Sequence, residues 1–294
     1  MEIDVILPYY GDSPHFRAAV RSVLAQRHTD WRLVCVDDAS IDGGAGTWLA
    51  SLNDPRVRSV RNDHNLGVAG NFARCLTLVE APHFIMMGSD DLMLPSHLST
   101  LAAAADRHPG AEMFQSGVQV IDEDGRPTLP LADRVKRILR PRTEHGDVVL
   151  KDEPLAVSLT RADWAYFPSI LWRSETAQRI GFDQRFDIAL DLGLILDIAL
   201  DGGRLIVIDP VTFTYRRHRA SASMSSARSG ERFMQERLFF LEYAERFRRR
   251  GWSRAARVAQ HHVISRLNAA TETPGALLSR DWVAVRSLAA HLFR

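Results

Sequence analysis

The sequence predicts an α/β protein whose mostly parallel sheet is covered by helices on both faces. Short apolar runs typical of buried strands, such as 31–36 and 83–88, alternate with helical patterns through the first half of the chain. Several of these runs are apolar on both faces, which is typical of parallel strands packed between helices. The composition agrees with a globular protein, since 46% of the residues are hydrophobic and 25% are charged.

The first elements follow one another at short spacing. A strand at 2–8 ends at a proline, and Ser13-Pro14 then opens a helix that runs to about residue 26. Serine is a good N-cap and proline suits the first helical turn, so the order of these two residues supports the helix. The next expected elements are a strand at 31–36, a helix at 47–52, a strand at 57–61, a helix at 68–79, a strand at 83–88 and a helix starting at Pro95.

The pattern is weaker after the strand expected at 113–120. Residues 122–147 are rich in Asp, Arg, Pro and Gly without clear periodicity, and we expect them to form a surface loop. The remaining expected elements are helices at 174–180 and 191–200, strands at 205–209 and 211–215 broken at Pro210, and helices from about Glu231 with breaks at Gly251 and 273–275. The expected division is one domain at 1–225, with halves at about 1–120 and 121–225, followed by a C-terminal helical segment at 226–294.

Charge and cysteine content narrow the class of protein. A net charge of +1 gives no global reason to expect a nucleic-acid partner. From Arg216 to the end, however, 16 Arg residues stand against 6 Asp or Glu. This excess predicts either a solvated helix face or peripheral contact with anionic lipid or an acidic partner. Cys35 and Cys75 lie in apolar contexts without paired spacing, so we expect both to be reduced core residues.

The sequence contains no apolar run close to the ~18 residues that a membrane span requires. Met1 leads directly into the first expected strand, without the pattern of a signal peptide. These two observations predict a soluble, cytoplasmic protein.

Paired acids follow two of the expected strands. Asp37-Asp38 ends the second strand and Asp90-Asp91 ends the fourth, although either pair could serve only as a turn and helix cap. In sheets of this class ligands gather beyond the carboxyl ends of the strands, so both pairs should converge on one crevice. Mg²⁺ and Mn²⁺ typically take one or two protein carboxylates when substrate phosphates supply other ligands. The arrangement predicts a nucleoside diphosphate held through a metal ion.

Two common nucleotide motifs are missing from the sequence. There is no G-x-x-x-x-G-K-[ST] loop, which counts against a P-loop NTPase. There is also no G-x-G-x-x-G after the first strand, which counts against a dinucleotide oxidoreductase. Asp42-Gly-Gly-Ala-Gly46 is only a weak imitation in the wrong place.

The ordered motifs resemble a family-2 inverting nucleotide-sugar glycosyltransferase of the A-type fold, which has a Rossmann-like nucleotide-binding sheet. The resemblance covers roughly residues 3–225 and is strong because many weak pieces occur in the right order. They are Val5-Ile-Leu-Pro-Tyr-Tyr10, Ser22-Val-Leu-Ala-Gln26, Val36-Asp-Asp-Ala-Ser40 with Asp42-Gly43, Asn65-Leu-Gly67, Gly88-Ser-Asp-Asp91 with Pro95, Ile180-Gly-Phe-Asp183, Asp191, and Tyr215-Arg-Arg-His218 followed by Ser221 and Ser223. Gly88 and Leu190 stand where the family often has acidic residues.

The resemblance implies a role for individual residues. Asp191 matches the general base, although Asp183 and Asp187 are nearby competitors and a helix N-cap is the structural alternative. The implied metal ligands for Mn²⁺ or Mg²⁺ are Asp90, Asp91 and His218, and the implied substrate-binding residues are Pro8, Tyr10, Asp38, Asn65, Asn71 and Asp90, with Asp38 on the base or ribose. Trp164 and Tyr166 could stack on a sugar ring or could simply be core aromatics.

The implied reaction moves one sugar from a UDP-, dTDP- or GDP-linked donor to a hydroxyl or amine of a small-molecule, glycan or lipid-linked acceptor. Processive members of the family carry membrane spans and a Q-x-x-R-W motif, which are missing here, so single additions are expected. Two alternatives remain open. A sugar-phosphate nucleotidyltransferase shares a similar sheet and metal requirement, and a nucleotide-sugar binding module without catalysis is compatible with Gly88.

Overall fold

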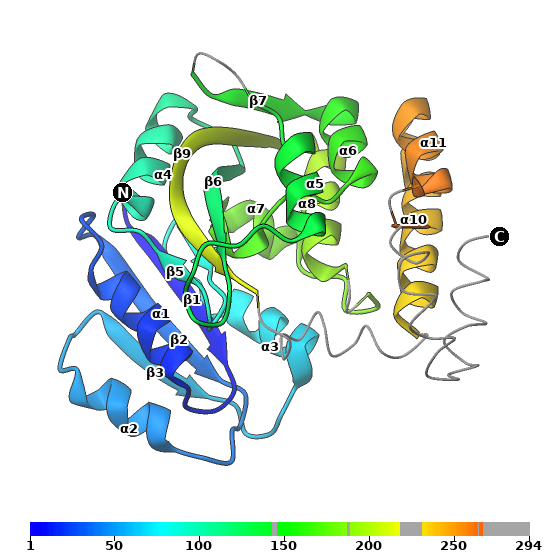
Figure 1. The fold of residues 1–294 in the computed structure, drawn as a ribbon. Coiled ribbons are helices and arrows are strands. Elements are labelled where there is room, and N and C mark those ends of the chain that lie inside the picture. The colour runs from blue at the N-terminus through cyan, green and yellow to red at the C-terminus, as the bar shows by residue number, and fades with distance from the viewer. Residues whose placement is uncertain (143–145, 187–188, 218–230, 264, 267–294) are drawn as a thin grey trace.

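The computed structural model describes residues 1–142, 146–186, 189–217, 231–263 and 265–266 (Figure 1). The first half alternates strands and helices as the sequence predicted. Its elements are β1 (Ile3–Tyr9), α1 (Pro14–Leu24), β2 (Trp31–Asp37), α2 (Gly44–Ser51), β3 (Val57–Arg61), α3 (Gly67–Leu76), β4 (His83–Met86), β5 (Leu92–Met93) and α4 (His97–Arg107).

The second half completes the sheet and adds helices on one side of it. Its elements are β6 (Met113–Ile121), α5 (Leu131–Leu139), β7 (Val148–Lys151), α6 (Asp152–Arg161), the 3₁₀ turn η1 (Phe167–Ser169), β8 (Ile170–Arg173), α7 (Ser174–Ile180), α8 (Leu190–Leu200), β9 (Arg204–Arg216), α10 (Glu231–Arg250) and α11 (Ser253–His261).

The strands within the described residues form one mixed sheet in the order β3-β2-β1-β4-β8-β6-β9-β5, with β7 paired to β9. Pairing is parallel from β3 through β2 and β1 to β4. Beyond β4, the pairs with β8, β5 and β7 are antiparallel and only β6–β9 is parallel. The α/β class is therefore confirmed, whereas the mostly parallel pairing holds for the N-terminal half alone.

Two hydrophobic cores cover the two faces of this sheet. Alternation along β1 directs Ile3, Val5 and Leu7 into the core beneath α1, α2 and α4, and Ile6 into the opposite core. Cys35 and Cys75 are both fully buried, one in each core, as the sequence predicted. Burial of apolar surface on both faces makes the strand ends the exposed, polar edge where a ligand can approach.

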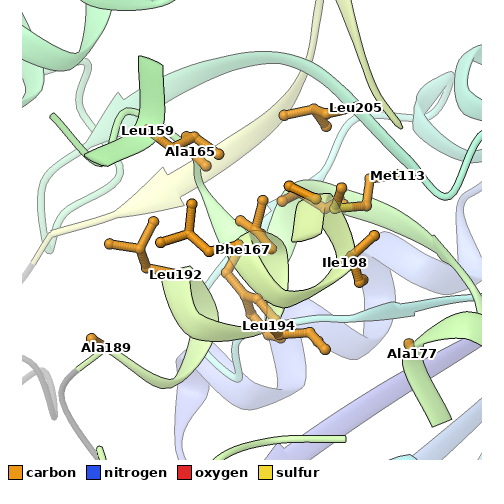
Figure 2. Close-up of a cluster of buried hydrophobic side chains, with 14 of the residues drawn as sticks. Met113, Leu159, Ala165, Phe167, Ala177, Ala189, Leu192, Leu194, Ile198 and Leu205 are labelled. Carbon is orange, nitrogen blue, oxygen red and sulfur yellow. The ribbon is translucent and has the colours of Figure 1, made fainter. Parts of the chain in front are cut away.

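Helix α8 lies inside the second core and carries a nearly continuous apolar surface. Figure 2 shows Leu192, Leu194 and Ile198 of this helix among side chains from β6, η1 and β9. A helix that is hydrophobic on all sides is buried, so the side chains packed around it determine its position. The first turn of α8, which holds Asp191, is therefore rigidly placed.

Residues 122–147 differ from the expected loop, because they contain helix α5 at Leu131–Leu139. The position of α5 that is most deeply buried carries a carboxylate, Asp133, instead of an apolar side chain. Asp133 accepts hydrogen bonds from the Arg217 guanidinium and from the Tyr166 hydroxyl. The apolar residues of α5 follow helical spacing, but they stand in a segment rich in Asp, Arg, Pro and Gly, and the buried position of the helix is an ion-paired carboxylate. The sequence therefore indicated a loop.

The expected break at Pro210 is also wrong, since β9 runs without interruption from Arg204 to Arg216. The register with β6 shifts around Gly117, and Asp209, Pro210 and Val211 are exposed on the resulting bulge. Proline lacks an N–H, so a bulge tolerates it where a regular ladder would not. A Cβ on Gly117 would lie 2.7 Å from the Asp209 carbonyl oxygen, so glycine permits the close approach of the two strands.

The C-terminal helices α10 and α11 pack against the second core, and Figure 1 shows them beside α6 and α8. Phe239, Tyr243 and Phe247 are buried there, and the Tyr243 hydroxyl donates to the Gly193 carbonyl oxygen. The expected boundary at 225/226 and the break at 273–275 lie outside the described residues. In the part of the chain that the structure describes, no helix is long and apolar enough to cross a membrane.

Candidate active site

The carboxyl ends of β2, β1 and β4 lie side by side at one edge of the sheet. Asp37 is in register with Tyr9, and the Asp38 N–H donates to the Tyr9 carbonyl oxygen at 3.0 Å. On the other side of β1, the Met87 N–H donates to the Ile6 carbonyl oxygen at 2.8 Å. Only β1 separates β2 from β4, which places their ends roughly 10 Å apart at ordinary strand spacing. The two acid pairs therefore share one edge, as the sequence predicted.

Asp37 organises the turn that follows β2. Its Oδ1 accepts from the Ser40 N–H at 3.0 Å, and its Oδ2 pairs with the Arg61 guanidinium. Between them, Ala39 adopts φ +57°, in the left-handed region that non-glycine residues rarely occupy. Strained backbone of this kind persists where surrounding contacts impose it, and it often marks a binding site.

Asp38 holds the next loop. Its Oδ1 accepts from the Asn62 side chain at 2.9 Å and from the Leu66 N–H at 2.8 Å, and its Oδ2 accepts from the Gly67 N–H at 3.0 Å. These contacts fix the entry into α3 and use both carboxylate oxygens. Since a carboxylate has about four acceptor positions, one remains for a ligand.

The Asn62 side chain also donates to the Asn71 side-chain oxygen, so both amides lie in the interior of this loop. Asn65, in contrast, is exposed and its side-chain oxygen accepts from the Gly67 N–H. Of these amides, Asn65 is the one at the edge where a ligand can bind.

Asp90 and Asp91 belong to a tight turn after β4, closed by the Asp91 N–H donating to the Gly88 carbonyl oxygen. Asp91 is fully buried, and its Oδ2 has no hydrogen-bond partner among the described residues. A Cβ on Gly88 would lie 2.5 Å from this Oδ2 and 3.3 Å from Asp90 Oδ1. Both oxygens therefore face the same small space beside the Gly88 backbone, and a side chain there would fill it.

The electrostatics of this turn favour a bound cation. Burial, together with the neighbouring Asp90, raises the pKa of Asp91 well above its ordinary value, while Arg216 opposes the shift. A buried carboxylate with an unpartnered oxygen fits a hard divalent ion such as Mg²⁺ or Mn²⁺. Among the described residues no group of three or more His, Cys, Asp or Glu side chains could hold a metal, so further ligands would have to come from elsewhere.

Arg216 fixes the acidic turn and was not expected from the sequence. Its N–H donates to Asp91 Oδ1 at 2.9 Å, and its Nε donates to the Asp90 carbonyl oxygen at 2.9 Å. One terminal nitrogen also donates to the carbonyl oxygens of Asp122 and Glu123. The side chain is buried by these contacts, so it acts as a clamp between β9 and two loops.

Asp191 occupies the first turn of α8, where Ala189 is the N-cap. Its Oδ1 accepts from the Leu192 N–H at 2.8 Å. Burial, followed by the charge of Asp163, raises the pKa of Asp191 to about 6, against the opposing effects of the Leu192 N–H and of Lys136. A carboxylate with a pKa near neutrality is suited to act as a general base.

Tyr215 connects the acidic turn to Asp191. Burial raises the pKa of the Tyr215 phenol, Arg217 opposes this, and the charges of Asp91, Asp90 and Asp191 raise it further. All three carboxylates therefore lie within electrostatic reach of one side chain. The structure thus brings two of the expected metal ligands, Asp90 and Asp91, near the expected base, although 100 positions separate Asp91 from Asp191 in the sequence.

A polar cluster behind Tyr215 was also missed by the sequence analysis. The Tyr166 ring lies 5.1 Å from the Tyr215 ring, and the Tyr166 hydroxyl donates to Asp133 at 2.8 Å. Arg217 forms two hydrogen bonds with Asp133 at 2.9 and 3.1 Å. The only sequence signal was the Tyr215-Arg-Arg run, which gives no indication of a partner on α5.

The other expected site residues differ in accessibility. Tyr10 is 58% exposed at the end of β1, while Pro8 is buried within that strand. Trp164 is fully buried and its ring N–H donates to the Ser158 hydroxyl at 3.0 Å, which agrees with the alternative of a core aromatic. Asp183 is paired with Arg185, which lowers the pKa of Asp183 and makes it a poor base. His218 and Asp187 lie outside the described residues.

Comparisons with known proteins agree on the family. Residues 4–167 match glycosyl transferase family 2. The chain is 28% identical over 127 residues to the putative glycosyltransferase EpsE of Bacillus subtilis, which covers 42% of this chain and 45% of EpsE. It is 24% identical over 227 residues to the succinoglycan biosynthesis protein ExoO of Rhizobium meliloti, which covers 76% of this chain and 62% of ExoO. The matched segments therefore span less than two thirds of either relative.

Solved structures of S. aureus TarS share the fold. TarS 1–349 in complex with UDP-GlcNAc has a TM-score of 0.71 at 17% identity, covering 99% of this chain and 80% of that chain. The same protein in complex with UDP has a TM-score of 0.61 at 16% identity, covering 82% and 65%. At this level of identity the likeness concerns the fold. Because the family match covers more than half of the sequence, the chain belongs to glycosyl transferase family 2.

Proposed function

We propose that this protein transfers one sugar from a nucleoside diphosphate sugar to an acceptor hydroxyl or amine, with inversion at the anomeric carbon and with help from a divalent cation. The observation that carries the proposal is the grouping of Asp90, Asp91 and Asp191 around Tyr215. This grouping supplies an anchor for the leaving diphosphate and a base for the acceptor in one site.

In the proposed reaction, Asp191 takes the proton of the acceptor as the acceptor oxygen or nitrogen attacks the anomeric carbon. The bond between that carbon and the diphosphate oxygen breaks, and its electron pair leaves with the nucleoside diphosphate. Attack from the side opposite the leaving group inverts the configuration. The raised pKa of Asp191, about 6, lets the carboxylate be ionised at neutral pH and still accept the proton.

Asp90 and Asp91 would hold Mn²⁺ or Mg²⁺ at the acidic turn. The unpartnered, buried Oδ2 of Asp91 and the open space beside Gly88 support this assignment. When bound, the ion supplies positive charge that stabilises the departing diphosphate. Arg216 keeps both acids in place from the other side.

The nucleoside would lie beyond the ends of β1 and β2. Asp38 keeps one acceptor position for a base or ribose, and Tyr10 and Asn65 are exposed around it. UDP-, dTDP- and GDP-linked sugars are all candidates, and the UDP and UDP-GlcNAc complexes of TarS support starting with uridine donors.

The first test is turnover. Release of free nucleoside diphosphate should be measured for a panel of nucleotide sugars, with and without candidate acceptors. Hydrolysis or transfer of at least one donor is expected. Binding of a donor without any turnover across the panel would favour a binding module instead.

The second test is metal dependence, measured by calorimetry with UDP in the presence of Mn²⁺ or of a chelator. The wild type should bind UDP more weakly with chelator, and Asp91→Ala should remove that difference. Asp106→Ala, which changes an exposed carboxylate on α4, is the matched control and should behave as the wild type. Equal UDP affinity with and without chelator in the wild type would contradict the metal assignment.

A further inference from the structure

A second binding surface lies next to the active site, between α5 and the paired strands β6 and β9. It is a groove of about 910 Å³. Its strand side carries three valines, Val118, Val120 and the half-exposed Val211, together with Gln119 and Asp209. The bulge of β9, which Gly117 permits, forms part of this wall. Neither Asp90 nor Asp91 of the acidic turn lines this groove.

The helix side of the groove is cationic. Positions 133, 136, 137 and 140 follow the i, i+3, i+4, i+7 spacing that places side chains on one helix face, and all four line the groove. They are Asp133, Lys136, Arg137 and Arg140, and Arg142 extends the same wall. The carboxylate of Asp133 is already bound by Arg217. The stripe therefore presents positive charge to the groove.

Two of these cations have no carboxylate partner among the described residues. Lys136 lies 3.5 Å from Asp163, and Arg140 lies 3.5 Å from Asp209. No ion pair is recorded for Arg137 or Arg142 within the ranges that the structure describes, and both side chains are exposed. Cations gathered without matching acids repel one another, which an anionic ligand would relieve.

Arg140 gives independent support for an anion site. Its side chain is only 12% exposed, one terminal nitrogen donates to the Ile208 carbonyl oxygen at 2.6 Å, and its Nε has no partner among the described residues. Burial lowers the pKa of Arg140, Asp209 opposes this, and nearby Arg142 lowers the pKa further. An unused donor on a buried guanidinium is costly, and a phosphate oxygen is a suitable acceptor for it.

Lys136 links the groove to the surroundings of the proposed base, Asp191. Lys136 and Tyr166 line the groove, and the Lys136 ammonium donates to the Ala165 carbonyl oxygen at 3.1 Å. Asp163, beside Lys136, acts on Asp191 electrostatically. Lys136, which lines the groove, also acts on Asp191 electrostatically, so a ligand held in the groove lies near the proposed base.

We propose that this groove binds the acceptor, and that the acceptor carries a phosphate group next to an apolar chain. The phosphate would lie against Arg137, Arg140 and Arg142, and the chain against the valine wall. Leu131 and Ile138, both 70% exposed on α5, extend the apolar surface at the rim. This inference rests on the proposed glycosyl transfer, since it assigns the acceptor class of that same reaction.

The test uses the full chain and geranyl phosphate as the probe. Inorganic phosphate, which has only the anionic group, and geraniol, which has only the apolar chain, are the control ligands. UDP binding is measured first, and the probes are then titrated with UDP and Mg²⁺ at saturation so that the donor site is filled. Geranyl phosphate should bind more tightly than either half. Arg137→Ala and Arg142→Ala should each weaken it roughly tenfold, as expected for loss of one charge-assisted hydrogen bond.

Arg134→Ala is the matched control, since Arg134 is exposed on the same helix but does not line the groove. It should leave geranyl phosphate binding unchanged, and all three variants should bind UDP normally. Equal losses in Arg134→Ala would indicate a general charge effect and overturn the inference. Inorganic phosphate binding as tightly as geranyl phosphate would also overturn it. Failure of the probe with intact UDP binding rejects the groove alone, whereas failure of UDP binding rejects the donor site and the proposed function.

Discussion

The backbone N–H of Arg216 donates to Oδ1 of Asp91 at 2.9 Å across 125 positions of the chain. The side chain of the same residue binds the Asp90 carbonyl oxygen and two carbonyl oxygens of the loop after β6. One residue thus fixes both the position of the acidic turn and the distance of that turn from the loop after β6.

Arg216→Lys should destabilise the fold and weaken donor binding. Lysine keeps the charge and the backbone hydrogen bond but cannot reproduce the fork of the guanidinium. Loss of three buried hydrogen bonds should lower the free energy of unfolding by roughly 2–4 kcal/mol, measured by urea denaturation. Arg126→Lys, on an exposed arginine, is the control and should be neutral. Unchanged stability of Arg216→Lys would show that the clamp contributes little.

Gly88→Ala should impair metal-dependent binding of UDP without a large change in stability. The new Cβ would lie 2.5 Å from Asp91 Oδ2, in the space where that oxygen would meet a cation. Restoring the acid that relatives often have at this position, as Gly88→Asp, should not improve affinity for the same reason. Calorimetry with UDP and Mn²⁺ measures both variants. Higher affinity in Gly88→Asp would mean that the turn rearranges when metal binds.

Asp191→Asn should fold and bind UDP normally but transfer sugar at least a hundredfold more slowly. A general base contributes roughly 10²–10⁴ in rate, and asparagine cannot accept the proton. In the wild type, kcat should rise with pH through an apparent pKa near 6, as Asp191 ionises. Asp163→Asn should move this limb to lower pH, because the charge of Asp163 raises the pKa of Asp191. If the rise of kcat with pH has the same apparent pKa in Asp163→Asn as in the wild type, a group other than Asp191 is responsible for it.

Asp191→Asn should be more stable than the wild type at pH 7.5. Because the pKa of Asp191 is raised in the fold, its favourable contribution is full below about pH 4 and is lost as the pH rises through 6. The shift corresponds to about 3 kcal/mol at neutral pH, which Asp191→Asn would recover in part. Thermal melts at pH 4 and pH 7.5 should show a difference only at the higher pH. Lower stability of Asp191→Asn at both pH values would mean that Asp191 mainly stabilises the first turn of α8.

Asp38→Ala should lower the free energy of unfolding by roughly 1–3 kcal/mol, because it removes the hydrogen bonds from Asn62, Leu66 and Gly67 and leaves the Leu66 N–H without its acceptor. If Asp38 also reads the nucleoside, UDP affinity should fall more than pyrophosphate affinity. Asp63→Ala, on an exposed residue of the same loop, is the control. Equal losses for UDP and pyrophosphate would indicate that Asp38 acts only through the shape of the loop.

Local sequence patterns predicted much of the fold, because the residues that form the two cores recur at the regular spacings of strands and helices. The alternation along β1 and the cap at Ser13-Pro14 are each visible in a few consecutive residues, and the structure reproduces them. The acid pairs at 37–38 and 90–91 could be assigned to one edge because parallel strands end together. These features depend on residues that are close in the sequence, so the sequence by itself determined them. The sequence by itself also indicated the family.

The tertiary structure decided what depends on distant partners. Helix α5 is held by Asp133 and Arg217, which are 84 positions apart, and its apolar residues Leu131 and Ile138 are largely exposed. Trp164 is buried because α6 and η1 enclose it, although an isolated tryptophan could equally face a ligand. The raised pKa of Asp191 comes from burial and from Asp163. Burial and charge pairing arise only when the chain closes on itself, so the clamp at Arg216 and the cationic groove along α5 could be identified only in the folded protein.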